Sequence, residues 1–115
     1  MFIGSAEEAP KVNMDIPGAA NAVKQTLLGP AQGWDGWVMR MFTLKKRGNT
    51  PRHTHPWPHI NLIVSGSGTL HIDGKDNGVA QGSTAFVPAG TEHQFVNTGD
   101  EDFVFICIVP EQGDA

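Results

Sequence analysis

The 115-residue chain has little cysteine, few clustered basic residues and no long apolar run. Its single cysteine, Cys107, excludes an intramolecular disulfide and permits a reducing compartment. Basic residues cluster only at 45–47, and the formal net charge is -4, which argues against a nucleic-acid partner. The longest strongly apolar stretch, 103–109, is far too short to cross a bilayer. Residues 1–10 lack the basic and apolar regions of a secretory signal. These absences predict a cytoplasmic protein that binds neither nucleic acid nor membrane.

Turn-forming residues are abundant by contrast, with 14 glycines and 8 prolines. They separate short apolar segments at even spacing, a pattern typical of an all-β sandwich or barrel. Residues 19–28 also resemble a short helix, but Val23 and Thr26 are β-branched and favour a strand. We therefore expect strands at residues 22–28, 37–44, 59–64, 69–72, 83–88, 92–97 and 103–109, with the stretches between them, including 73–78, as turns.

The predicted domain organisation is simple because the length fits one domain. Residues 1–20 are expected to form an extended arm, 21–110 a barrel, and 111–115 a short tail. The segments 59–64 and 103–109 are apolar on both faces. One of those faces needs a cover, and we expect it and the arm to form a homodimer.

Three of the five histidines lie within residues 53–59, in the segment HTHPWPH. Two residues apart in an extended chain, His53 and His55 point to the same side. The prolines on either side of Trp57 favour extended backbone, so that His59 can begin the next strand. This arrangement predicts three imidazoles around one metal ion. His71, between two apolar residues, is expected to face solvent.

Four of the histidines lie in two segments in which glycines and other residues recur at defined spacings. The first runs Gly48-x4-His53-x-His55-x3-His59-x6-Gly66, and the second runs Gly82-x5-Pro88-x-Gly90-x2-His93-x3-Asn97. Together they resemble the two sequence motifs of the cupin superfamily, and the resemblance covers about residues 37–109. It implies a jelly-roll barrel, also called a conserved double-stranded β-helix, that holds a metal ion through His53, His55, His59 and His93.

Two positions depart from the family pattern. The first glycine lies one residue closer to the histidine pair, which matters little in a loop. His59 stands where the family has a glutamate, which resembles small single-domain bacterial cupins that hold a divalent ion, often manganese, with four histidines. The resemblance favours Mn or Fe, whereas imidazole chemistry also admits Zn, Ni and Cu. Open octahedral and closed tetrahedral coordination both remain compatible with the sequence.

Strand parity and the resemblance together predict the substrate pocket. On the last strand we favour the set containing Phe105 and Cys107 as inward, whereas on 37–44 the sequence leaves both faces open. If Arg40 points inward, a substrate carboxylate is a natural acceptor for its guanidinium. Trp57 is expected to cap the mouth, and Glu92 to face away. The predicted pocket residues are Arg40, Phe42, Trp57, Asn61, Phe95, Asn97, Phe105 and Cys107.

The metal centre and apolar pocket favour a non-haem metal-dependent dioxygenase that acts on a small organic substrate. A metal-dependent isomerase or lyase and a non-catalytic small-ligand-binding protein are the alternatives. The fold by itself does not select among them, because it carries many chemistries.

Overall fold

The computed structural model describes residues 1–114, which form an antiparallel β-structure without α-helices. None of these residues forms a helix long and apolar enough to cross a membrane. The elements are β1 (Val12–Asn13), β2 (Ala20–Leu28), the 3₁₀ turn η1 (Pro30–Gln32), β3 (Trp37–Asn49), β4 (His59–Ser65), β5 (Ser67–Ile72), β6 (Lys75–Ala80), β7 (Thr84–Val87), β8 (His93–Val96), β9 (Phe103–Pro110) and the 3₁₀ turn η2 (Glu111–Asp114).

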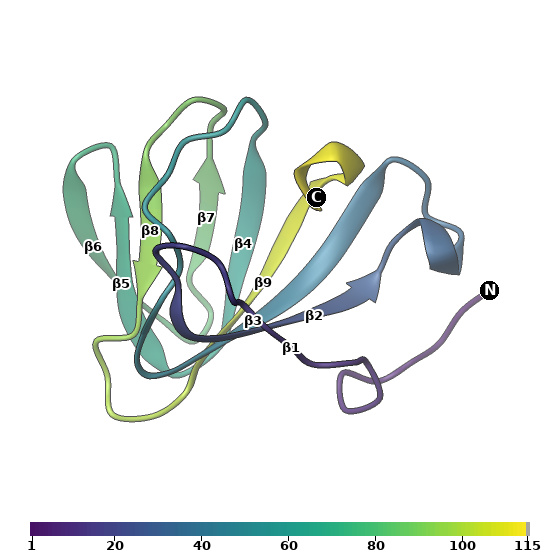
Figure 1. Cartoon of the computed structure of the whole chain (residues 1–115), viewed down its shortest axis with the longest axis horizontal. Coiled ribbons are helices and arrows are strands. Elements are labelled where there is room, and N and C mark those ends of the chain that lie inside the picture. Colours follow the sequence, from purple (N-terminus) through teal and green to yellow (C-terminus); the bar gives the residue numbers. More distant parts are fainter. Residues whose placement is uncertain (115) are drawn as a thin grey trace.

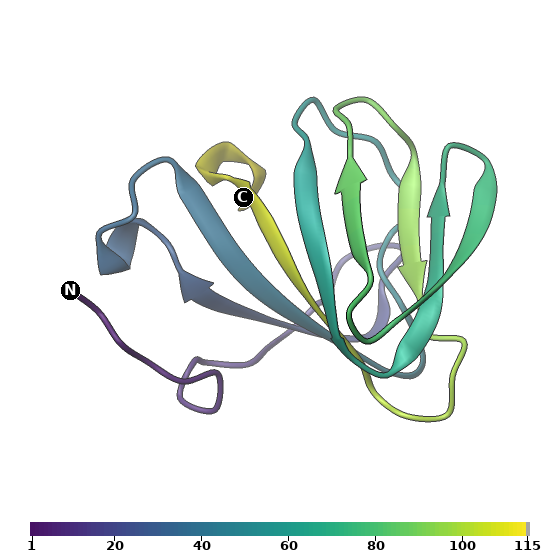
Figure 2. The same cartoon turned by 180° about the vertical axis from the view of Figure 1, so that it is seen from behind.

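The strands form one curled sheet in the order β6-β5-β8-β3-β9-β4-β7, and β2 and β1 extend it from β3. β3 belongs to both halves, since its last residue pairs with β8 while most of its length pairs with β2 and β9. The sheet therefore curls into a half-barrel, open at the top in Figure 1 and seen from behind in Figure 2. This architecture confirms the predicted jelly-roll class, and residues 19–28 are largely strand.

One predicted turn is wrong. Residues 73–78 were expected to form a turn, but only Asp73 and Gly74 turn, and Lys75–Ala80 returns as β6 against β5. Both turn residues have positive φ, 50° and 78°, as tight hairpins require. β6 lies at the sheet edge and most of its residues are exposed. It therefore lacks the alternating apolar pattern from which strands are predicted.

The core fills the inside of the half-barrel. On β9 the buried residues are Phe103, Phe105, Cys107 and Val109, the face that the sequence favoured. Four phenylalanines pack together there, with Phe95 and Phe105 stacked at a centroid distance of 4.1 Å. On β3 the inward set is that of Val38, Phe42 and Leu44, which places Arg40 on the inner side.

The arm that precedes β2 lies along that strand. Gln25, only 4 % exposed, donates its amide to the carbonyls of Ala6 and Ala9, and Val12 pairs with Lys24. Beyond β9, the predicted tail starts as η2, and residue 115 lies outside the described residues.

Gly66 shows why the first motif ends in glycine. It turns the chain between β4 and β5 with φ 77°, a conformation that side chains disfavour. A Cβ atom at this position would also collide with the carbonyl oxygen of Asp102. The motif glycine therefore fits a tight turn against the loop that precedes β9.

Candidate metal centre

Four histidines converge at the mouth of the half-barrel from three parts of the chain. His53 and His55 lie in the loop between β3 and β4, His59 begins β4 and His93 begins β8. The backbones of His53 and His93 exchange two hydrogen bonds, of 3.2 and 3.1 Å, which fasten the loop to β8. The four rings lie in contact, with centroid separations from 4.8 Å to 5.3 Å in five pairs.

The nitrogen atoms of the rings come closer than the centroids. One nitrogen each from His53, His55 and His93 lies within 4.8 Å of the others, the separation expected of ligands to one ion. His59 is not part of that group of three, but its Nε2 lies 3.1 Å from Nε2 of His93. Two nitrogens that bind one ion at right angles, each about 2.1 Å from it, lie about 3 Å apart.

Hydrogen bonds select the tautomers of three rings. Nδ1 of His55 lies 2.8 Å from the carbonyl of Trp57, and Nδ1 of His93 lies 2.8 Å from the carbonyl of Thr91. A carbonyl oxygen only accepts, so both Nδ1 atoms carry a proton, and in a neutral ring Nε2 is then left with a lone pair.

His59 is held in the same way by a side chain. Asn61 donates its amide to the carbonyl of Ile106, which turns its Oδ1 toward His59 Nδ1 at 2.8 Å. Nδ1 of His59 therefore donates, and its Nε2 also presents a lone pair. Such partners orient the imidazoles of metal sites and raise their basicity as ligands.

The neutral state of these rings near pH 7 favours a cation between them. Burial is the main cause that lowers the pKa of His59 to about 3 and that of His93 to about 4, and neighbouring histidines lower both further. Burial lowers the pKa of His53 as well, with added repulsion from His55 and Arg40. Near neutral pH the Nε2 atoms of His59 and His93 thus oppose each other with lone pairs, a contact that a bound cation relieves. The donor set fits a divalent metal ion.

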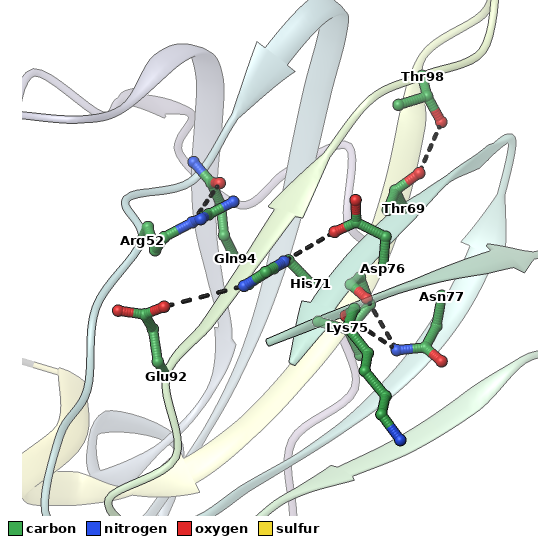
Figure 3. A network of polar contacts seen from close by, with 10 residues as sticks. Arg52, Thr69, His71, Lys75, Asp76, Asn77, Glu92, Gln94 and Thr98 are labelled. Carbon is green, nitrogen blue, oxygen red and sulfur yellow. Dashed lines mark hydrogen bonds and ion pairs between the residues drawn. The ribbon is translucent and has the colours of Figure 1, made fainter. Parts of the chain in front are cut away.

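The fifth histidine lies outside this centre. His71 projects from the outer side of β5, where its Nδ1 lies 2.7 Å from Asp76 and its Nε2 lies 3.8 Å from Glu92, as Figure 3 shows. Its side chain is 12 % exposed, so the two carboxylates cover it more than the predicted solvent-facing position implied. Glu92 faces away from the centre, as expected from its alternation with His93.

A cavity of about 540 Å³ adjoins the histidines, within the range of small-molecule sites. The four histidines and six of the eight predicted pocket residues line it, and these six are Arg40, Phe42, Trp57, Phe95, Phe105 and Cys107. The sequence did not indicate the contribution of the arm (Val12–Ile16), nor those of Lys24, Thr50, Pro51 and Gly113. These residues carry no motif, and only the folding of distant segments brings them to the mouth.

The other two predicted pocket residues do not line the cavity. Asn61 turns to His59 and the carbonyl of Ile106, as described above. Asn97 donates to the carbonyls of Leu44, Lys45 and Glu101, and accepts from the backbone N–H of Gly99. A buried amide needs such partners, and through them Asn97 fastens β3 to the loop after β8.

Arg40 and Cys107 are opposite each other on β3 and β9, inside the cavity. Nη2 of Arg40 donates to Sγ of Cys107 at 3.1 Å, and the guanidinium lies 5.0 Å from the centre of the Phe42 ring. Burial raises the pKa of the Cys107 thiol, although Arg40 opposes that shift. The thiol is therefore neutral near pH 7, as expected of a buried cysteine that packs as a small apolar residue.

Trp57 lines the cavity beside the histidines. Its ring stacks on His55 at 4.9 Å with an interplanar angle of 12°. It also packs against Gly113 of η2 so closely that a Cβ atom there would clash with the indole. Trp57 therefore shields one side of the histidine cluster and joins it to the end of the chain.

Comparisons with known proteins agree with this architecture. The cupin domain family Cupin_2 matches residues 40–109. The oxalate-binding protein of Thermotoga maritima is 34 % identical over 50 residues, which cover 44 % of this chain and 41 % of that protein. Auxin-binding protein 1 of Arabidopsis thaliana is 25 % identical over 118 residues, which cover 94 % and 58 %. The chain thus spans about half the length of these two relatives.

Solved structures show the same fold. The polyketide cyclase RemF from Streptomyces resistomycificus superimposes with a TM-score of 0.89 at 27 % identity, covering 96 % of this chain and 79 % of the cyclase. A sugar phosphate isomerase of the cupin superfamily from Silicibacter pomeroyi superimposes with a TM-score of 0.81 at 21 % identity, covering 93 % and 74 %.

Proposed function

The chain belongs to the Cupin_2 family of cupin domains, and from this premise we propose that it binds one divalent metal ion through His53, His55, His59 and His93. Mn or Fe is the favoured ion, with Zn, Ni or Cu as the alternatives. The observation that carries the proposal is the pair of Nε2 atoms at 3.1 Å, both presenting lone pairs. A four-imidazole set leaves the dication uncompensated by any carboxylate and therefore favours an electron-rich oxygen ligand.

The reaction proposed first is the dioxygenase-type oxidation of a small organic substrate. A divalent ion at this site supplies Lewis-acid or redox chemistry. The chain's own residues provide the surroundings, since Phe42, Phe95 and Phe105 form an apolar wall. Within residues 1–114 the only carboxylate that lines the cavity is Asp15, on the exposed arm.

A second function, metal-dependent isomerisation, lyase or cyclisation chemistry without dioxygen, is supported by the likeness to RemF, whose name describes a polyketide cyclase. A third, non-catalytic binding of a small ligand, is supported by the names of the oxalate-binding and auxin-binding relatives. All three place a small molecule in the same cavity.

Measuring turnover in air and under argon distinguishes the three proposed functions. We expect the metal-loaded protein, screened with aromatic and dicarbonyl compounds, to consume oxygen with its substrate and to lose at least about 100-fold in rate under argon. Equal turnover under argon would instead establish the isomerase or lyase function. Saturable binding without any turnover would establish ligand binding. An oxygen electrode and product analysis provide the readouts.

We further propose that the protein is a homodimer formed through the outer-sheet patch, which consists of Ile60, Leu62, Val64 and Phe86. These side chains are between 36 % and 61 % exposed although they are large and apolar. Ile60 pairs with Phe86 across β4 and β7, so the patch is continuous. Apolar surface of this kind on a small protein commonly marks an interface.

The oligomeric state tests this proposal. We expect the wild type to sediment as a dimer and Ile60→Glu/Phe86→Glu to sediment as a monomer, with the dissociation constant raised at least about 100-fold, because two charges would be buried at the interface. Ala80→Glu, on the exposed edge strand β6, is the matched control and should remain dimeric. A monomeric wild type at micromolar concentration would refute the dimer.

A further inference from the structure

Arg40 is a largely buried cation with weak hydrogen-bond partners. Its side chain is only 13 % exposed. Of its five N–H donors, one reaches the Cys107 sulfur, which is a weak acceptor. Its Nε has no hydrogen-bond partner among the described residues. A guanidinium removed from water needs strong acceptors, because its burial is otherwise unfavourable.

One carboxylate approaches Arg40, and it comes from η2. Oδ1 of Asp114 lies 3.7 Å from Nη1 of Arg40, too far for a hydrogen bond, and 2.7 Å from Nζ of Lys24. Oδ1 of Asp114 thus forms a close ion pair with Lys24 but has no hydrogen-bond partner among the described residues. Both cations line the cavity that holds the histidines.

The turn that carries Asp114 has few attachments. The backbone N–H of Glu111 donates to the carbonyl of Gly36 at 2.8 Å, and Gly113 packs against Trp57. None of the residues of η2 is buried. A small displacement of this turn therefore moves the carboxylate away from Arg40 without disturbing the core.

The rest of the cavity is suited to an aromatic molecule. Phe42 and Phe105 stack at 5.4 Å beside Arg40, and Phe95 continues the wall toward His93. Arg40 and the four histidines line this same cavity. One ligand in this cavity therefore meets a cation at one end and the histidines at the other.

We propose that the cavity binds aromatic carboxylates, whose carboxylate pairs with Arg40 and Lys24 in the place that Asp114 otherwise takes. Arg40 pairs readily with carboxylates in a two-point geometry, and the aromatic body lies along the phenylalanine wall. Asp114 then acts as an internal competitor that ligand displaces. This inference deepens the proposed function and rests on it for the metal at the far end of the ligand.

The test compares 1-naphthoate with its uncharged analogue 1-naphthamide on the zinc-loaded protein, by calorimetric titration. We expect wild type to prefer the carboxylate at least tenfold, and Arg40→Gln to lose that preference. Asp114→Asn should bind 1-naphthoate several-fold more tightly and leave 1-naphthamide unchanged, because it removes only the competing charge. Asp114 lies on a partly exposed turn without buried residues, so Asp114→Asn keeps the test valid if Arg40→Gln fails to fold.

The same titrations on metal-free protein in a chelator separate this inference from the metal proposal. A carboxylate preference that persists without metal and depends on Arg40 supports the inference even if no metal binds. A preference that needs the metal but survives Arg40→Gln places the carboxylate on the ion and overturns it. Weaker or unchanged 1-naphthoate binding by Asp114→Asn, or no saturable binding by that variant, also overturns it.

Discussion

Replacement of His93 by alanine is expected to weaken metal binding by more than about 100-fold and to leave no stoichiometric ion after dialysis. His93 contacts the rings of the other three histidines, so its loss removes a ligand and opens the cluster. Loss of an outer hydrogen-bond partner of a ligand alone costs 10- to 100-fold, and loss of the ligand itself should cost more. Elemental analysis measures the bound metal directly.

Thermal unfolding gives a second readout of the same change. An ion present at about 1,000 times its dissociation constant stabilises the folded state by about 4 kcal/mol. We therefore expect added Mn or Zn to raise the melting temperature of wild type by several degrees and that of His93→Ala not at all.

His71→Ala is the matched control, because His71 lies on the outer side of β5 and away from the cluster. It should retain about one ion per chain and the full thermal shift. Asn61→Ala should fall between the two, since it removes only the partner of His59 Nδ1. Equal metal content in His93→Ala and wild type would refute the four-histidine centre.

Phe103→Ala is expected to have the largest effect on stability, lowering the free energy of unfolding by about 3–5 kcal/mol. Phe103 is fully buried and packs against Phe95 and Phe105, and a phenylalanine this enclosed leaves a cavity when it is truncated. The whole domain is stabilised by only about 5–15 kcal/mol, so the variant loses a large share of its stability. Urea denaturation of the metal-free protein measures this loss without a contribution from bound ion.

Phe2→Ala makes the same chemical change at a residue that is 50 % exposed in the arm. It should cost less than about 1 kcal/mol. Phe103 does not line the cavity, so its truncation tests the core and not the ligand site. A loss below 1 kcal/mol for Phe103→Ala would mean that the aromatic cluster does not pack as described.

Local patterns were enough to predict most strands. The alternation of apolar and polar residues along a strand, and the glycines at its ends, lie within a few residues of one another. The wrong prediction of a turn at residues 73–78 also follows from this dependence on local patterns. β6 is an exposed edge strand with mostly polar side chains. Its sequence therefore lacks the alternating apolar residues that would have predicted its pairing with β5. The alternation of side chains likewise left two possible inward faces for β3. Only the packing of β3 against β9 showed that the face with Arg40 is the inward one.

The candidate centre divides in a similar way. The spacing of His53, His55 and His59 is local, and the second motif pointed to His93 through its resemblance to cupins. No local pattern indicated that Asn61 orients His59, because that role depends on the carbonyl of Ile106, 45 residues away.

The sequence by itself therefore determined the β-class, the positions of most strands and the residues that supply imidazoles, since each follows from short-range patterns or from the spacing of the two motifs. Only the tertiary structure decided how those imidazoles meet, which asparagine supports them, and that Asp114 lies beside Lys24 and Arg40. These contacts join residues from β2, β3 and η2. The curling of the sheet brings such distant segments together, and no short-range sequence pattern predicts these contacts.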